Sequence, residues 1–186
     1  TTRNKILAIY NDENSQIVFT DTPGIHKPHN RLGEMMVRSA RESMNDNDIL
    51  IMVVDASRTV QDTEREIAES IKKTGLKSIL VINKVDVVKK DSLLPLIANY
   101  SSLNDFDAIV PVSAKTGDGV NLLIDEIKSL LESGPQYYYE DMITDQPERK
   151  MVAEIIREKL LRTLDEEIPH GTAVTIEEWK ERRDTV

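Results

Sequence analysis

Three continuous apolar runs, separated by helix-like segments, constrain the fold of this chain more than any other feature. They are ILIMVVD at 49–55, SILVI at 78–82 and AIVPVS at 108–113. None alternates polar and apolar residues, which is typical of parallel strands buried on both faces. Helix-like segments follow at about 62–73, from near Asp91, and at 119–132. This alternation predicts an α/β sheet that is mostly parallel and flanked by helices.

Two further β-rich runs come before these strands. KILAIY at 5–10 and QIVFTD at 16–21 are separated by NDENS, a turn cluster of hairpin length. We expect this antiparallel pair to form a reversed edge of the sheet, and a polar helix to follow at about 31–44.

Polar residues follow the ends of four predicted strands. They are Asp21, Thr22, Pro23 and Gly24; Asp55; Asn83, Lys84, Val85 and Asp86; and Ser113, Ala114 and Lys115. Open α/β sheets bind ligands beyond the carboxyl ends of their strands, so these groups are expected to converge on one site. Asp55 is expected only to cap the loop after its strand.

The string NKVD at 83–86 suits a guanine base. The Asp86 carboxylate can accept hydrogen bonds from N1 and the exocyclic amine of guanine, a donor pair that adenine lacks. Asn83 can address the O6/N7 edge, and the Lys84 stem can lie across the base with its ammonium towards the sugar. The alternative is a helix-capping Asp86 beside a solvated Lys84.

The string SAK at 113–115 lies one strand later. The Ala114 backbone N–H can donate to the base O6, while Ser113 braces the loop and Lys115 covers the ring. A loop with a helix cap at Thr116 and Gly117 explains the tripeptide equally well.

The string DTPG at 21–24 suits the phosphate end of a nucleotide. Asp21 can bind a water held by Mg²⁺, which takes few carboxylates and keeps several waters. Gly24, without a Cβ, lets its N–H approach a γ-phosphate. A simple Asp-Thr-Pro-Gly turn is the alternative.

In this order on successive strands, DTPG, NKVD and SAK resemble the third, fourth and fifth motifs of the translation-factor-related GTPases. TTR at 1–3 looks like the second motif. The longer strings DTPGIHKP at 21–28 and REKLLRTLDEEIPH at 157–170 are similar to the Era family of bacterial GTPases, which carry a C-terminal KH domain.

The resemblance implies a Ras-like fold of the P-loop-NTPase type at 1–132, a linker at 133–147, and the first part of an α+β KH-type RNA-binding domain at 148–186. It implies GTP or GDP as ligand and Mg²⁺ as cofactor. Thr2 and Asp21 would hold the metal, and Thr2, Gly24 and Ile25 would lie at the reacting phosphate. The nucleotide contacts would be Asp21, Thr22, Pro23, Gly24, Ile25, Asn83, Lys84, Val85, Asp86, Ser113, Ala114 and Lys115.

The same resemblance implies a function and partners. These are GTP hydrolysis, binding to the 3′ end of 16S ribosomal RNA and assistance in 30S subunit maturation. A monomer in the cytoplasm, with peripheral association at the inner face of the cell membrane, is the corresponding expectation.

Two departures qualify these expectations. No G-x-x-x-x-G-K-[ST] string occurs, and no G-x-x-G string occurs in the final segment. We therefore expect these residues alone to bind nucleotide poorly and RNA hardly at all.

Ile25 stands where Ras-like enzymes place a water-orienting Gln. Slow intrinsic hydrolysis is expected, with His26 either a base or a solvated loop residue. A GTP-gated scaffold with negligible turnover, and a pseudo-GTPase used for protein contacts, are the alternatives.

Composition and the C-terminal part add a few constraints. The chain has no cysteine and a net charge of −9, so neither a thiolate metal site nor a basic nucleic-acid surface is indicated. No apolar run is long enough to span a bilayer. An amphipathic helix is predicted near 148–167, with Val152, Ile155, Ile156, Leu160 and Leu164 on one face, and a strand is expected after Gly171.

Overall fold

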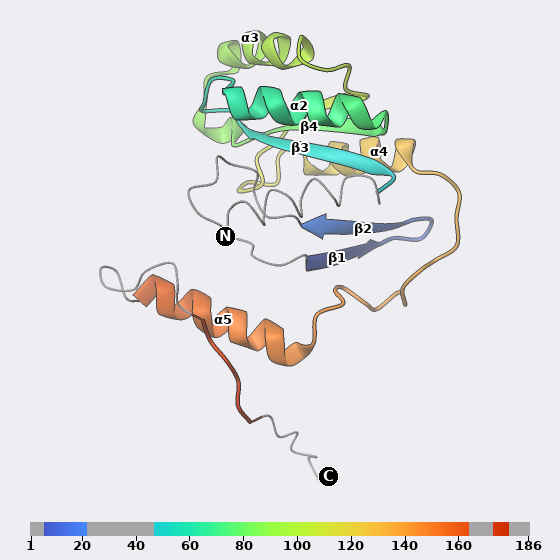
Figure 1. Ribbon diagram of the computed structural model, residues 1–186, viewed down its shortest axis with the longest axis vertical. Helices are drawn as coiled ribbons and strands as arrows, with labels where there is room; N and C mark the ends of the chain where they lie inside the picture. Colours follow the sequence, from blue (N-terminus) through green and yellow to red (C-terminus); the bar gives the residue numbers. More distant parts are fainter. Residues whose placement is uncertain (1–5, 22–46, 164–172, 179–186) are drawn as a thin grey trace. The chain divides into compact units, whose positions relative to one another are not determined.

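The computed structural model describes residues 6–21, 47–163 and 173–178 (Figure 1). Two compact units make up the chain. The described part of the first consists of residues 13–15 and 47–137, and the second combines residues 6–12 and 16–21 with the segment from Tyr138 onward.

The first unit is built on a parallel sheet. Its strands β3 (Ile49–Asp55), β4 (Lys77–Asn83) and β5 (Ala108–Pro111) lie in the order β3-β4-β5, and both neighbouring pairs are parallel. This arrangement confirms the parallel α/β prediction. The register sets Asp55 opposite Asn83, so the polar residues that end β3 and β4 are neighbours.

Helices connect these strands on both faces of the sheet. Helices α2 (Asp62–Thr74) and α3 (Lys90–Ser101) lie on one face and α4 (Val120–Leu130) on the other (Figure 1). A short 3-10 turn, η2 (Val85–Val87), follows β4 directly. The placement of helices on both faces is why the strands carry apolar residues at consecutive positions.

The core lies mainly between the sheet and the α2/α3 layer. Leu80 and Ile82 of β4 are fully buried there with Ala68 of α2 and Tyr100 of α3. Because successive strand side chains alternate in direction, Ile79 and Val81, also buried, face the opposite layer. Burial on both faces makes β4 the rigid centre from which the NKVD residues extend.

Replacing Tyr100 with Phe is expected to lower the free energy of unfolding by about 1 kcal/mol, the usual net value of one hydrogen bond. The buried Tyr100 hydroxyl donates to Glu64 Oε2 at 2.7 Å, and that oxygen also accepts the Gln61 backbone N–H at 2.9 Å. The variant therefore weakens an interaction that ties α3 to the start of α2. Urea unfolding measures the change, with Tyr139→Phe, at an exposed tyrosine, as the control. Equal stability of both variants would contradict the assignment.

The second unit begins with a β-hairpin. Strands β1 (Ile6–Asn11) and β2 (Gln16–Asp21) pair antiparallel, with Ile6 opposite Asp21. The hairpin was correctly predicted, and in the described residues it forms a two-stranded sheet of its own. A strand joins a sheet only by exchanging backbone hydrogen bonds. Ile9 N–H of β1 donates to Ile143 O of the linker at 2.9 Å.

The linker is fastened to this hairpin by side-chain amides. Gln16 Nε2 donates to Tyr138 O and Gln16 Oε1 accepts from Tyr138 N, both at 3.0 Å. Asn11 Nδ2 donates to Glu140 O at 3.0 Å, and Thr144 Oγ1 donates to Leu7 O at 2.6 Å. Residues 138–144 therefore follow β1 as an ordered segment.

We expect Gln16→Ala to release this segment and to speed amide exchange at Tyr138 by roughly thirtyfold, because two hydrogen bonds of about 1 kcal/mol each are lost. Hydrogen–deuterium exchange measures the effect. The matched control is Glu13→Gln in the hairpin turn, which should leave exchange at Tyr138 unchanged. An unchanged exchange rate in Gln16→Ala would show that the hydrogen bonds between Gln16 and Tyr138 do not hold the linker.

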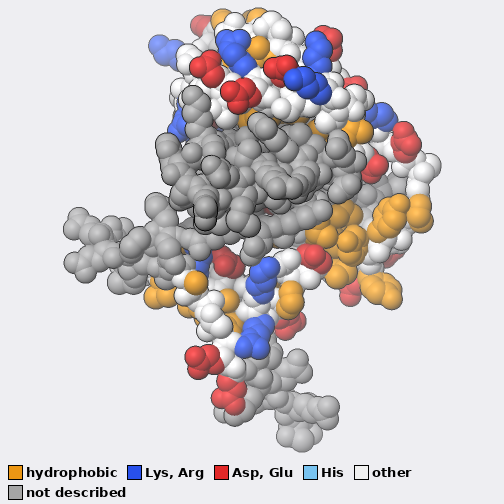
Figure 2. Space-filling model, viewed as in Figure 1, with side chains coloured by type: hydrophobic (Ala, Val, Ile, Leu, Met, Phe, Trp, Pro, Cys, Tyr) orange, Lys and Arg blue, Asp and Glu red, His pale blue; other side chains and the backbone are white. Residues whose placement is uncertain are grey.

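Helix α5 (Glu148–Thr163) confirms the predicted helix, and much of its apolar face is exposed. Ile155, Ile156 and Leu160 are exposed at 55%, 42% and 38%, and Leu164 lies outside the described residues. On the face of the molecule that Figure 2 shows, Lys and Arg side chains are interspersed with Asp and Glu side chains, and no patch of a single charge sign forms there. The expected strand after Gly171 is not formed over 173–178, because no described segment pairs with it.

Candidate functional site

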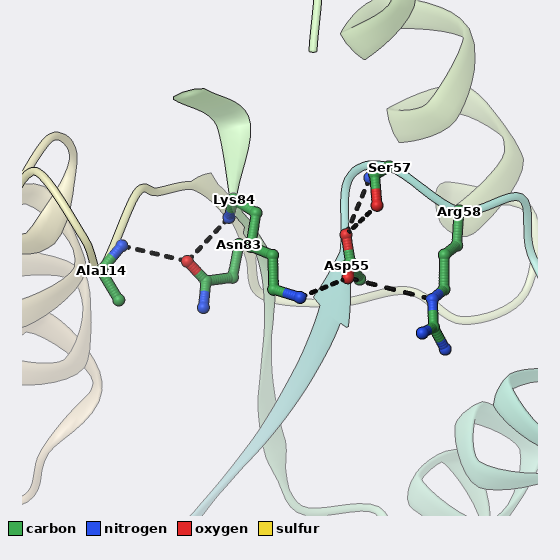
Figure 3. Close-up of polar contacts among 6 residues, drawn as sticks. All are labelled: Asp55, Ser57, Arg58, Asn83, Lys84 and Ala114. Atoms are coloured by element: carbon green, nitrogen blue, oxygen red, sulfur yellow. Dashed lines mark hydrogen bonds and ion pairs between the residues drawn. The ribbon is translucent and has the colours of Figure 1, made fainter. Parts of the chain in front are cut away.

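Asn83 joins the two loops predicted to read a base. Its side-chain Oδ1 accepts the Lys84 backbone N–H at 2.7 Å and the Ala114 backbone N–H at 3.0 Å (Figure 3). The Ala114 N–H, predicted to donate to the base, thus donates to Asn83 in this structure. The Asn83 amide has its Nδ2 donor left to address a ligand, and a donor is what the O6/N7 acceptor edge of guanine requires.

Asp86 and Ser113 form the second link between these loops. Ser113 Oγ donates to Asp86 Oδ1 at 2.7 Å and accepts the Thr116 N–H at 3.2 Å. Ser113 is almost fully buried, whereas Asp86 is exposed. The serine therefore fixes one carboxylate oxygen and leaves the exposed carboxylate able to accept further hydrogen bonds. This is the bracing role predicted for Ser113.

Val85 and Lys115 complete the pair of loops. Val85 N–H donates to Val112 O at 3.2 Å and its side chain packs against the core. Lys115 is exposed at the turn after β5. Val85 therefore anchors the loop, and the covering role of Lys115 stays a prediction.

Asp55 does more than the loop capping that the sequence predicts. The capping is present: its Oδ1 accepts Ser57 N–H at 2.9 Å and Ser57 Oγ–H at 2.6 Å. In addition, its Oδ2 accepts a hydrogen bond from Lys84 Nζ at 2.6 Å (Figure 3). The Lys84 and Ser57 hydrogen bonds hold the pKa of the Asp55 carboxyl well below its usual range. Sequence reasoning missed this contact because it joins residues 29 positions apart.

The phosphate end of the predicted site is described only at Asp21, an exposed residue that ends β2 in the second unit. Thr2, Thr22, Pro23, Gly24 and Ile25 lie outside the described residues, as do His26 and the helix expected at about 31–44. Among the described residues no cluster of three or more His, Cys, Asp or Glu could hold a metal ion. A single carboxylate fits Mg²⁺, which binds to one or two carboxylates together with water and substrate phosphates.

In the parts of the chain that the structure describes, no helix is long and apolar enough to cross a bilayer.

The chain is similar to known GTP-binding proteins in sequence. Residues 2–170 match the family model of the elongation factor Tu GTP binding domain. The chain is 47% identical over 181 residues to GTPase Era of Syntrophus aciditrophicus, covering 97% of this chain and 59% of that protein. It is 49% identical over 185 residues to GTPase Era of Clostridioides difficile, covering 99% and 62%. The chain thus spans about three fifths of the length of these relatives.

Solved structures agree with the sequence relatives. A crystal structure of Era in complex with MgGDPNP and nucleotides 1506–1542 of 16S ribosomal RNA superposes with a TM-score of 0.79 at 38% identity, covering 86% of this chain and 55% of that one. A variant of Aquifex aeolicus Era bound to GDP and AlF4− gives a TM-score of 0.82 at 36% identity, covering 90% and 58%.

Proposed function

The chain belongs to the family of GTP-binding domains represented by elongation factor Tu and is a relative of GTPase Era; from this premise we propose that it is a guanine-nucleotide switch that hydrolyses GTP. The observation that carries the proposal is the pair of loops at the ends of β4 and β5. They are tied together through Asn83 and Ser113 while the Asp86 carboxylate remains exposed.

Guanine selectivity follows from the chemistry of Asp86. An ionised carboxylate offers acceptors only, and guanine presents two neighbouring donors at N1 and its exocyclic amine. Adenine offers an acceptor at N1 and would leave the carboxylate unpaired. The two loops that make this contact are held by Val85, Ser113 and Ala114, and Lys115 would cover the base. Asn83 Nδ2 addresses the opposite edge of the base.

The phosphate end would be formed by Thr2, Asp21, Thr22, Pro23, Gly24 and Ile25. Asp21 and Thr2 would hold Mg²⁺, which when bound neutralises charge on the phosphates. Ile25 can neither donate nor accept a hydrogen bond, so this chain supplies no side chain there to orient the attacking water. Slow intrinsic hydrolysis is the consequence, and backbone groups or a partner would set the rate.

The crystal structure of a related Era in complex with nucleotides of 16S ribosomal RNA supports an RNA partner. We infer that the full-length protein binds the 3′ end of 16S rRNA and assists 30S subunit maturation, as a monomer in the cytoplasm with peripheral membrane association. Residues 148–186 would be the start of a KH-type domain. The linker is hydrogen-bonded to the hairpin, and in the sequence the hairpin lies between the two predicted metal-binding residues, Thr2 and Asp21. The linker therefore offers a route by which a change at the nucleotide would reach the KH-type part.

The test uses the full-length gene product. Fluorescent GDP and GTP are titrated with and without Mg²⁺, against the matching adenine nucleotides, and single-turnover GTP hydrolysis is followed with and without 30S subunits. Guanine-selective binding and hydrolysis above the solution rate are expected. Equal binding of adenine and guanine nucleotides, or none of either, would overturn the proposal. Binding without hydrolysis under both conditions would favour the scaffold, for which the side chain of Ile25 is the motivating observation.

A further inference from the structure

We propose that Asp55 is a positioning residue for nucleotide binding: it holds the Lys84 ammonium on the β3 side of the sheet, so that the Lys84 stem lies across the end of β4 as a preformed wall of the base site. The proposal rests on the proposed function, since it concerns the same site. Asp55 acts through Lys84 and has no contact with the base in this scheme.

The Asp55 carboxylate is itself fixed before it meets the lysine. Its backbone lies opposite Asn83 in the β3–β4 register, and Ala56 N–H donates to Asn83 O at 2.8 Å. Both hydrogen bonds from Ser57 reach Oδ1, which orients Oδ2 towards β4. The Asp55 side chain is only 18% exposed. The lowered pKa of Asp55 means that the carboxylate stays charged at neutral pH.

Lys84 leaves β4 in a defined direction. It is the one residue other than glycine with a positive φ among the described residues, at 67°, a left-handed conformation that few L-residues adopt. Asn83 Oδ1 accepts its backbone N–H and so stabilises this turn. The side chain is 57% exposed and its ammonium lies 2.6 Å from Asp55 Oδ2. A long, exposed lysine would otherwise sample many rotamers, so this contact selects one orientation.

The order of the strands decides where the Lys84 side chain lies relative to the base-reading loops. Asp86, Ser113 and Ala114 join the loops after β4 and β5, whereas Asp55 is the last residue of β3, on the other side of β4. Figure 3 shows this arrangement, with Ala114 and Asp55 on opposite sides of Asn83 and the Lys84 side chain directed at Asp55. The stem therefore runs from the NKVD loop towards the end of β3, and its methylene groups cross the end of β4 at the border of the base site.

Mutations can distinguish this role of Asp55 from two alternative roles. Asp55 could serve only Ser57 as a loop cap, in which case Lys84 is incidental. It could also restrain Lys84 against nucleotide entry, in which case removing the charge would strengthen binding. Arg58, with its Nε at 3.9 Å from Asp55 Oδ2 and its side chain 65% exposed, is a weaker partner of the same carboxylate.

The experiment is a double-mutant cycle in the full-length protein, with the Kd for GDP measured by fluorescence for Asp55→Asn, Lys84→Met and the double variant. Asp55→Asn is expected to weaken GDP binding by about threefold to fivefold, which is the upper range for an exposed ion pair. Lys84→Met should weaken binding more, and the double variant should match Lys84→Met within about twofold, because the effect of Asp55 passes through Lys84. Single-turnover hydrolysis at saturating GTP should be unchanged in Asp55→Asn.

Three controls complete the design. Glu69→Gln removes a lysine–carboxylate pair of similar length on α2, Lys73 to Glu69 at 2.8 Å, and should leave the Kd unchanged. Ser57→Ala removes the hydroxyl hydrogen bond to Asp55 Oδ1 but keeps the backbone N–H bond and the lysine contact, so it should weaken GDP binding less than Asp55→Asn does. Asp55→Glu, which keeps the charge, should recover part of the lost affinity, and a melting curve for each variant establishes that it is folded.

Unchanged or tighter GDP binding by folded Asp55→Asn, an independent effect of the two substitutions, or an equal loss in Ser57→Ala would overturn the positioning role. Failure of the unmodified protein to select guanine nucleotides would overturn the proposed function instead.

Discussion

Replacing Asp86 with Asn is expected to reduce the affinity for GDP and GTP by roughly 10⁴-fold, the scale on which hydrogen-bonding sites reject a mismatched partner. An Asn side chain can keep its Oδ1 against the Ser113 hydroxyl, where Asp86 Oδ1 accepts at 2.7 Å. It would then present an NH₂ group where the carboxylate presents an acceptor. That donor would meet the two donors of guanine, whereas xanthine carries a carbonyl in place of the exocyclic amine and would be accepted.

Titration of the full-length variant with GDP and with xanthosine diphosphate measures this inversion. Asp91→Asn, at an exposed carboxylate in the first turn of α3, is the matched control and should keep the original preference. Unchanged GDP binding in Asp86→Asn would show that Asp86 does not read the base, and the guanine assignment would fail with it.

The parallel sheet and the grouping of NKVD with SAK were predictable because both follow from local sequence. Uninterrupted apolar runs identify strands that are buried on both faces, and parallel strands direct their carboxyl ends to one edge. Knowing that edge was enough to place Asn83, Asp86 and Ser113 together. The same reasoning predicted that Ser113 would brace the loop, since a hydroxyl at the end of a buried strand can hydrogen-bond to the neighbouring turns.

What the sequence did not predict depends on contacts between distant residues. The Asp55–Lys84 contact needs the side-chain direction set by a left-handed lysine, which no apolar pattern encodes. The clamp of Gln16 on Tyr138 joins residues 122 positions apart. Strand patterns likewise show that a strand will pair, but not with which partner. The exposed apolar face of α5 shows the same limit, since helical spacing identifies a face without identifying what covers it.

The turn before α4 illustrates how a single position can decide the geometry of the site. A helix cap at Thr116 and Gly117 was the alternative explanation of the SAK string, and the residue that precedes α4 is Gly119. Gly119 has a φ of 73°, and a Cβ added to it would lie 2.3 Å from Pro111 O and 3.3 Å from Val112 Cα. Both contacts are with the backbone at the end of β5, one residue before Ser113.

Gly119→Ala is therefore expected to lower the free energy of unfolding by roughly 3 kcal/mol or more, a size that point mutations reach only through a defined steric or packing defect. About 1–2 kcal/mol comes from the left-handed conformation. The remainder comes from displacing Pro111 and Val112, since backbone atoms cannot rotate away as a side chain can. The same displacement moves Ser113 away from Asp86, so guanine nucleotide affinity should fall together with stability.

Gly117→Ala separates the two contributions. Gly117 has a φ of 84° but nothing within 4 Å of an added Cβ, so this variant carries the conformational cost without the clash. Urea unfolding of both variants gives the difference directly, and GDP titration at a temperature where both are folded gives the effect on the site. If Gly119→Ala were no less stable than Gly117→Ala, the close approach of α4 to the end of β5 would not be what holds the Ser113 loop in place.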